Sequence, residues 1–177
     1  MNEFEFTLKF ALTDTDTDAT VFFDALMEAG CDDAVVGFGQ KGKVALSFCR
    51  ESATAFDAIT SAILQVRKAI PGATLIEASP DFVGLSDVAG ILGVTRQYVR
   101  KIMSNNVDSF PNPVHSGKSS LWHLHSILLW VSKFNSRPID PTTLDIAKLT
   151  MELNFARESV QLADKPTPEI YSLVSNG

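Results

Sequence analysis

The chain has 177 residues, of which 45% are hydrophobic, so it is long enough for one or two real cores, and wholesale disorder is excluded. No stretch approaches the roughly 18 uninterrupted apolar residues of a membrane span, and the first residues lack the basic-then-apolar layout of a secretion signal. We therefore expect a cytoplasmic protein without membrane contact. The net charge of −6 argues against nucleic-acid binding when the chain is taken as a whole.

The charge is distributed unevenly along the chain. Residues 1–80 hold 12 acidic and 6 basic residues, net −6, and residues 138–177 hold 6 and 3, net −3. Residues 81–137 hold 3 acidic and 6 basic residues, net +3, together with all 3 histidines. A basic segment between two acidic ones indicates a local site for a polyanion.

Residues 1–79 alternate strand and helix patterns. Polar/apolar alternation predicts a first strand, and Asp18 is placed to cap the helix that follows the Thr/Asp loop. The predicted elements are strand 3–10, helix 19–29, hairpin 34–38 with 43–48, helix 52–69 and strand 73–78. The order βαββαβ is that of a ferredoxin-like domain. The side chains expected to face inward include Val21, Phe56 and Leu64, and Cys31 and Cys49 are expected to be buried thiols.

Residues 85–102 predict two short helices joined by a sharp turn. Ser86 can cap the first helix and Thr95 the second, Gly93 supplies a positive φ, and Val94 fills the angle between the helices. Val99 and Ile102 then point inward. The side chains left outside offer groups that suit guanine and adenine edges and phosphates, and they are Arg96, Gln97, Arg100 and Lys101.

The next segment predicts a wing. Residues 110–115 are extended because two prolines exclude a helix, residues 116–119 form a turn, and residues 120–122 return as a strand, before a helix from about His125. Arg96 and Gln97 lie where base edges are reached, and Lys118 at the tip is expected to contact phosphate. The predicted DNA-contacting residues are Thr95, Arg96, Gln97, Tyr98, Arg100, Lys101, His115, Lys118 and Ser119.

This central segment resembles the winged helix-turn-helix modules related to MerR, AlpA and the phage excisionases. The residues that carry the resemblance are Leu92-Gly93-Val94-Thr95-Arg96-Gln97, Val99, Phe110-Pro111-Asn112-Pro113-Val114, Gly117, Trp122 and Ile127-Leu128-Leu129-Trp130. The resemblance covers residues 85–131 and departs from the family pattern at His123 and Ser126. It implies a DNA-binding domain over residues 83–135 in a transcription regulator, a recombination directionality factor or an antitoxin.

The C-terminal third predicts one long helix, 140–163, with Asp140 as its cap and Pro141 as its first residue, followed by a tail, 164–177. Apolar residues occupy more than one face of this helix, so it either packs on its own domains or pairs with a second copy. We predict a homodimer whose interface includes Leu144, Met151 and Phe155.

No catalytic constellation, metal-ligand set or cofactor motif stands out. The Thr/Asp loop lacks the Gly and Glu of a calcium loop, and the three histidines have no acid or Cys beside them in sequence. We therefore expect an α+β non-enzyme that acts as a dimeric repressor-type regulator without metal or cofactor. Its acidic N-terminal domain is expected to bind a basic toxin, as in an antitoxin, or, alternatively, a small molecule, as ACT-like domains do.

Overall fold

Alternating apolar side chains build the N-terminal sheet of this mixed α+β protein. The computed structural model describes residues 1–134, 138–162 and 164–174. Its main sheet is antiparallel with the strand order β2-β3-β1-β4, made of β1 (Asn2–Ala11), β2 (Ala34–Gly37), β3 (Lys43–Ser52) and β4 (Thr74–Ser79). The long β1–β3 ladder pairs Phe6 with Phe48, whose rings stack with centroids 5.1 Å apart. One face of each strand is therefore committed to a core.

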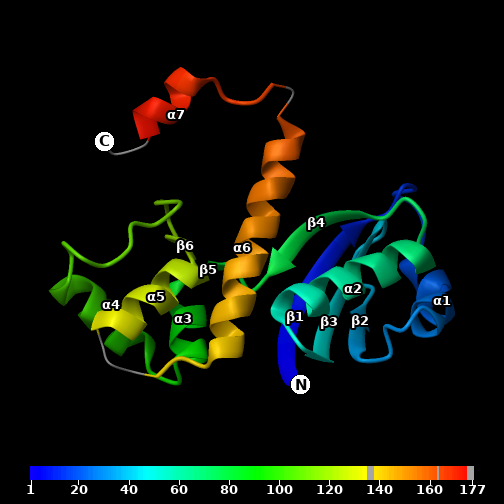
Figure 1. Ribbon diagram of the computed structural model, residues 1–177, viewed down its shortest axis with the longest axis horizontal. Helices are drawn as coiled ribbons and strands as arrows, with labels where there is room; N and C mark the ends of the chain where they lie inside the picture. Colours follow the sequence, from blue (N-terminus) through cyan, green and yellow to red (C-terminus); the bar gives the residue numbers. More distant parts are fainter. Residues whose placement is uncertain (135–137, 163, 175–177) are drawn as a thin grey trace.

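Two helices cover that face of the sheet (Figure 1). A single 3-10 turn (Ala19–Phe22), capped by Asp18, leads into α1 (Phe23–Glu28), and α2 (Ala55–Ala69) follows β3. The core of this sheet unit, residues 2–79, holds the inward residues of β1 and β3 together with Leu26, Ile59 and Val66. Arg50 is also buried there, because Asp33, Ser61 and the Gly30 carbonyl accept hydrogen bonds from its guanidinium group.

A second, helical unit spans residues 82–134. It comprises β5 (Phe82–Val83), α3 (Leu85–Ile91), α4 (Arg96–Asn105), β6 (Trp122–His123) and α5 (Leu124–Phe134). Strands β5 and β6 pair antiparallel, and a separate core gathers Val88, Val99 and Ile127 with the rings of Phe110, Trp122 and Trp130. Among the described helices, none is both long and apolar enough to cross a membrane.

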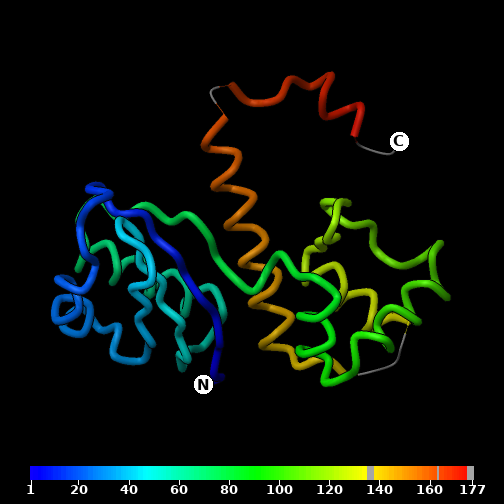
Figure 2. Tube along the Cα trace, turned by 180° about the vertical axis from the view of Figure 1, so that it is seen from behind, coloured from blue at the N-terminus to red at the C-terminus, as the bar shows by residue number. Residues whose placement is uncertain are grey.

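Helix α6 (Pro141–Gln161) lies between the two units, as both views show (Figures 1 and 2). Asp140 caps it through the amides of Thr142 and Thr143. Ile146 belongs to the core of the sheet unit and its neighbour Ala147 to the core of the helical unit. Farther along, Thr150 donates to the Pro80 carbonyl of the segment that connects the units, and Asn154 bonds the backbone of Ala78 near the end of β4. The alternative of internal packing therefore holds for this helix as far as Asn154.

Several expectations about the sheet unit were wrong. Helix α2 begins after Thr54, whose side chain accepts the Asp57 amide, instead of at Ser52, because β3 continues through that residue. Val21, in the 3-10 turn, and Phe56 and Leu64, on α2, are exposed, because these side chains point away from the sheet core. Cys31 is buried, but Cys49 lies on the uncovered face of the sheet. There a hydrogen bond with Glu3, together with the negative charges of Glu3 and Glu5, raises the pKa of Cys49.

The predicted tail also contains a helix, α7 (Pro168–Val174), which stands away from the two units in Figure 1. Pro168 fixes a backbone angle suited to the first helical position, and Glu169 follows it in the first turn, where a negative charge is favourable. The apolar side chains of this short helix remain exposed. Of the predicted dimer residues, Leu144 packs against the helical core, Met151 is half-buried, and Phe155 is 67% exposed.

Of the predicted dimer residues, Phe155 is therefore the one open to a second copy. Deleting α6 would remove residues from both cores, so a single substitution is the better test. We expect Phe155→Ser to weaken dimerisation at least about 30-fold, as removal of a large apolar anchor costs about 2 kcal/mol or more. The measurement is light scattering over a concentration series. Val35→Ser, at a position on β2 that is also largely exposed, is the control and should leave association unchanged. A Phe155 variant that self-associates like the unmodified protein would refute this interface.

Candidate nucleic-acid interface

Helices α3 and α4 meet at a short, sharp turn. Gly93 has φ +61°, which L side chains rarely adopt, and the Val94 amide donates to the Ala89 carbonyl at 2.9 Å. The Thr95 hydroxyl caps α4 by accepting the Tyr98 amide at 3.2 Å. Val99 is fully buried against α3, so the rotation of α4 about its own axis is fixed. The sequence predicted these features.

The first helix is capped differently from the prediction. Its N-cap is Gly84, whose amide donates to the Asp87 carboxylate at 2.8 Å, and Ser86 lies inside the helix with an exposed side chain. Helix α3 thus begins two residues earlier than a Ser86 cap allows. The Ser86 hydroxyl is therefore not the cap of this helix and lies in solvent.

Because burial of Val99 fixes the rotation of α4, the polar side chains of this helix face solvent. All the helix residues predicted to contact DNA are exposed: Thr95, Arg96, Gln97, Tyr98, Arg100 and Lys101. In the described part of the chain, no carboxylate lies within 4.0 Å of the charged groups of Arg96, Arg100 or Lys101. By contrast, Arg50 and Lys9 each pair with an acid. The positive charge of α4 is therefore available to a partner.

The predicted wing is only partly correct. Residues 110–113 form no strand, because Pro111 and Pro113 have no amide hydrogen to donate to a ladder. A single bridge joins His115 to Leu121, and β6 pairs with β5 instead. The exposed turn 116–119 that carries Lys118 is closed by the Leu121 amide, which donates to the His115 carbonyl at 3.0 Å.

Aromatic side chains hold this loop against the helical unit. The centroid of the Phe110 ring lies 6.2 Å from that of Trp122 and 5.0 Å from that of Trp130, and both pairs are in edge-to-face contact. Each indole also donates a hydrogen bond to the loop, Trp122 to the Pro111 carbonyl at 3.0 Å and Trp130 to the Ser109 hydroxyl at 3.3 Å. The loop that carries Lys118 is therefore anchored at its base even though it lacks a regular hairpin.

A cleft of about 580 Å³, here the basic cleft, opens between the start of α3, one face of α4 and the segment after Lys118. Its lining brings together three cations, Arg96, Arg100 and Lys118, and three hydroxyls, Ser86, Ser119 and Ser120. Asp87 is the one acid among its lining residues, and its carboxylate already accepts the Gly84 amide. Gln97, Lys101 and His115 do not line this cleft. The predicted DNA residues therefore divide into two groups.

Ser86 and Ser120 are the site residues that sequence reasoning missed. Ser86 was interpreted as a cap, and Ser120 as part of a return strand. Ser86 reaches the cleft from α3 and Ser120 from the returning loop, and no local pattern reports that these two segments line the same cleft. The hydroxyl-rich run from Ser116 to Ser120 was the available signal.

The three histidines lie in different surroundings. His115 is exposed in the loop, and His123 Nδ1 lies 2.7 Å from an oxygen of the buried Asp81. Burial lowers the pKa of His125, which is half-buried between α5 and α6 near Leu144 and Lys148. The three side chains thus have separate surroundings, and His115 is the exposed one among them.

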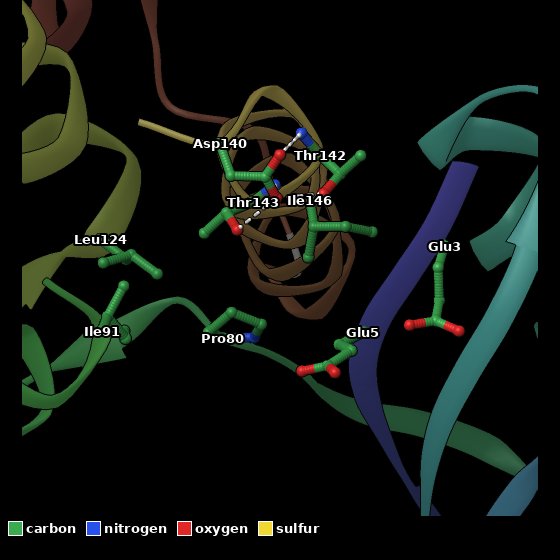
Figure 3. Close-up of a pocket in the computed structure, with 9 residues that line it drawn as sticks. All are labelled: Glu3, Glu5, Pro80, Ile91, Leu124, Asp140, Thr142, Thr143 and Ile146. Carbon is green, nitrogen blue, oxygen red and sulfur yellow. Dashed lines mark hydrogen bonds between the residues drawn. The ribbon is translucent and has the colours of Figure 1, made fainter. Parts of the chain in front are cut away.

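A second cleft, of about 440 Å³, lies between the two units (Figure 3). Glu3 and Glu5 project into it from β1, opposite the apolar side chains of Ile91, Leu124 and Ile146. Asp140 also lines it, and hydrogen bonds, led by that from the Thr142 hydroxyl, hold the pKa of this carboxyl below its ordinary value. The acidic wall makes this cleft a poor place for a polyanion.

Comparisons of the chain with protein-family models, with curated proteins and with solved structures found no match.

Proposed function

We propose that this chain is a sequence-specific, double-stranded-DNA-binding transcriptional regulator of the repressor type. The observation that carries the proposal is the set of four exposed cations on α4 and the adjoining turn, Arg96, Arg100, Lys101 and Lys118, none of which has an acidic partner among the described residues. Unneutralised cations on one short helix and a neighbouring loop suit the phosphates and base edges of a duplex.

The proposal extends to the two finer fold assignments. The helical unit is proposed to be a winged helix-turn-helix whose wing is reduced to one bridge and an anchored loop. Support for this comes from the α3–Gly93–α4 geometry and from the return of the chain to β5. The sheet unit is proposed to be ferredoxin-like, and the support is its strand order together with the order β1-α1-β2-β3-α2-β4.

Two alternative partners are predicted for the sheet unit, a basic protein and a small molecule. Its excess of 12 acidic over 6 basic residues in positions 1–80 favours a basic protein partner, as in an antitoxin bound to its toxin. The cleft between the units favours a small ligand instead, because carboxylates face an apolar wall across it. Such a lining suits an organic cation with an aliphatic part.

The DNA-binding proposal is tested by selection from a pool of random duplexes with the full-length protein. We expect an enriched motif that is bound at least about 1,000-fold more tightly than unselected duplex. The double reversal Arg100→Glu/Lys101→Glu should weaken binding to every duplex by at least about 100-fold at 0.1 M salt, because attraction becomes repulsion on the surface of α4.

The matched control is Lys41→Glu/Lys43→Glu, which makes the same charge change on exposed residues of the sheet unit. It should leave DNA affinity within about twofold of the unmodified protein, since β3 and the rest of the sheet unit lie apart from α4 (Figure 1). If selection enriches no motif, or if both double reversals act alike, the proposal fails.

A further inference from the structure

Arg96, Arg100 and Lys118 converge, although they are separated by up to 22 positions in the chain. Arg96 and Arg100 are four residues apart on α4 and so share one face of that helix. That face forms one wall of the basic cleft, and Lys118 with Ser119 and Ser120 lines another. Gln97 and Lys101, also four residues apart, occupy the adjoining exposed face, outside the cleft.

The two faces of α4 meet different parts of a duplex. A concave cleft of about 580 Å³ is far too small for a duplex but admits one phosphodiester unit of its backbone. Base edges lie at the floor of a major groove about 8.5 Å deep, so they are reached only by side chains that project from a convex surface. The adjoining face with Gln97 and Lys101 is such a surface.

The chemistry of the cleft also fits an anion. Its three cations have no acidic partner among the described residues, and three serine hydroxyls supply further donors. Asp87 offsets one charge and is itself engaged by the Gly84 amide. A net charge of about +2 remains for a ligand, taking three cations and one carboxylate. Arginine and lysine with hydroxyl donors are the groups that proteins use on phosphate oxygens.

Accepting the proposed DNA binding, we infer that the basic cleft holds a single backbone phosphate of the bound duplex, shared by Arg96, Arg100 and Lys118, and that Gln97 and Lys101 determine sequence preference. Arg96 is thereby reassigned from base contact to phosphate contact. The serine hydroxyls of the cleft complete the shell around the same phosphate. One clamped phosphate fixes the position of α4 in the groove, so that its adjoining face meets the base edges in register.

The inference is tested by the salt dependence of binding to the selected duplex and to a random duplex. The slope of log K against log salt changes by about 0.9 for each phosphate neutralised. We expect the triple variant Arg96→Gln/Arg100→Gln/Lys118→Gln to flatten the slope by about one unit for each bound protomer, because the three cations of a protomer share one phosphate. It should weaken both duplexes by the same factor. Lys43→Gln, on the sheet unit, is the control and should leave the slope unchanged.

A second readout locates the phosphate directly. Neutral methylphosphonate linkages are placed one at a time along the selected duplex. A neutral linkage at one position in each half-site should lower the affinity of the unmodified protein at least about tenfold. The same linkage should leave the affinity of the triple variant unchanged. Gln97→Ala and Lys101→Gln should instead change the motif obtained by selection and leave that linkage effect in place.

Three outcomes would overturn the inference. A slope change near three units per bound protomer for the triple variant would mean three separate phosphates for each protomer. An altered motif for Arg96→Gln alone would return Arg96 to base contact. A methylphosphonate effect that persists in the triple variant would place the phosphate elsewhere. In each case DNA binding stands, whereas an unmodified protein that binds no duplex removes the proposed function itself.

Discussion

Replacing Asn154 by alanine is expected to lower the free energy of unfolding by about 3 kcal/mol, because three hydrogen bonds at a buried junction are lost together. The Asn154 side chain is buried on α6, where its Oδ1 accepts the Ala78 amide at 2.9 Å. Its Nδ2 donates to the Ala78 carbonyl at 2.7 Å and to the Asp81 carboxylate at 2.8 Å. Truncation leaves these groups of β4 and of the connecting segment without a partner.

Urea denaturation followed by circular dichroism measures this loss. Asn112→Ala is the matched control, since Asn112 is exposed in a loop, and its change should stay within about 0.5 kcal/mol. Asn154→Asp should destabilise at least as strongly as alanine, because it places a second carboxylate beside Asp81. Equal stabilities of the Asn154 and Asn112 alanine variants would show that this junction does not hold the two units together.

Trp130→Ala is expected to cost about 3–5 kcal/mol of stability, the range for removing a large aromatic side chain from a core. The indole is 6% exposed, contacts the Phe110 ring at 5.0 Å, and donates to the Ser109 hydroxyl. Because Phe110 and Ser109 belong to the loop that leads to Lys118, the variant should also weaken DNA binding at temperatures where it remains folded.

Phe134→Ala is the control for Trp130. Phe134 stacks on the same indole at 5.5 Å but is 61% exposed, so its removal should cost less than about 1 kcal/mol. Thermal and urea unfolding give the stabilities, and titration of the selected duplex gives the affinity. A Trp130 variant that keeps full DNA affinity while losing stability would separate the anchoring of the loop from the proposed function.

Elements whose signals are local were predicted well. Strand β1 follows from strict alternation, the sharp turn before α4 from Gly93 and Thr95, and the start of α6 from Asp140 followed by Pro141. In each case the residues that define the element also satisfy its backbone groups, so no distant partner is required. The exposure of the α4 cations was predicted in the same way, since burial of Val99 fixes which face of the helix is left in solvent.

Elements that depend on distant partners were predicted less well. The segment 110–115 was expected to be a strand, but a strand needs a partner, and Trp122 and His123 pair with Phe82 and Val83 instead. Phe56 and Leu64 lie at helical spacing in α2 yet face solvent, because nothing in the described residues covers the outer side of that helix. Hydrophobic spacing identifies an apolar face but not whether anything packs on it.

By itself the sequence determined the α+β class, the order of the main elements and the basic character of the central segment, because propensity, capping and charge are local properties. Only the tertiary structure decided that α6 joins the two cores through Ile146 and Ala147, and that Lys118 meets Arg96 and Arg100 across one cleft. Such convergence results from the packing of segments distant in the chain. The contact between Phe110 and Trp130 anchors the loop that brings Lys118 to the cleft. Charge content thus follows from the sequence, whereas the position of each charge depends on the fold.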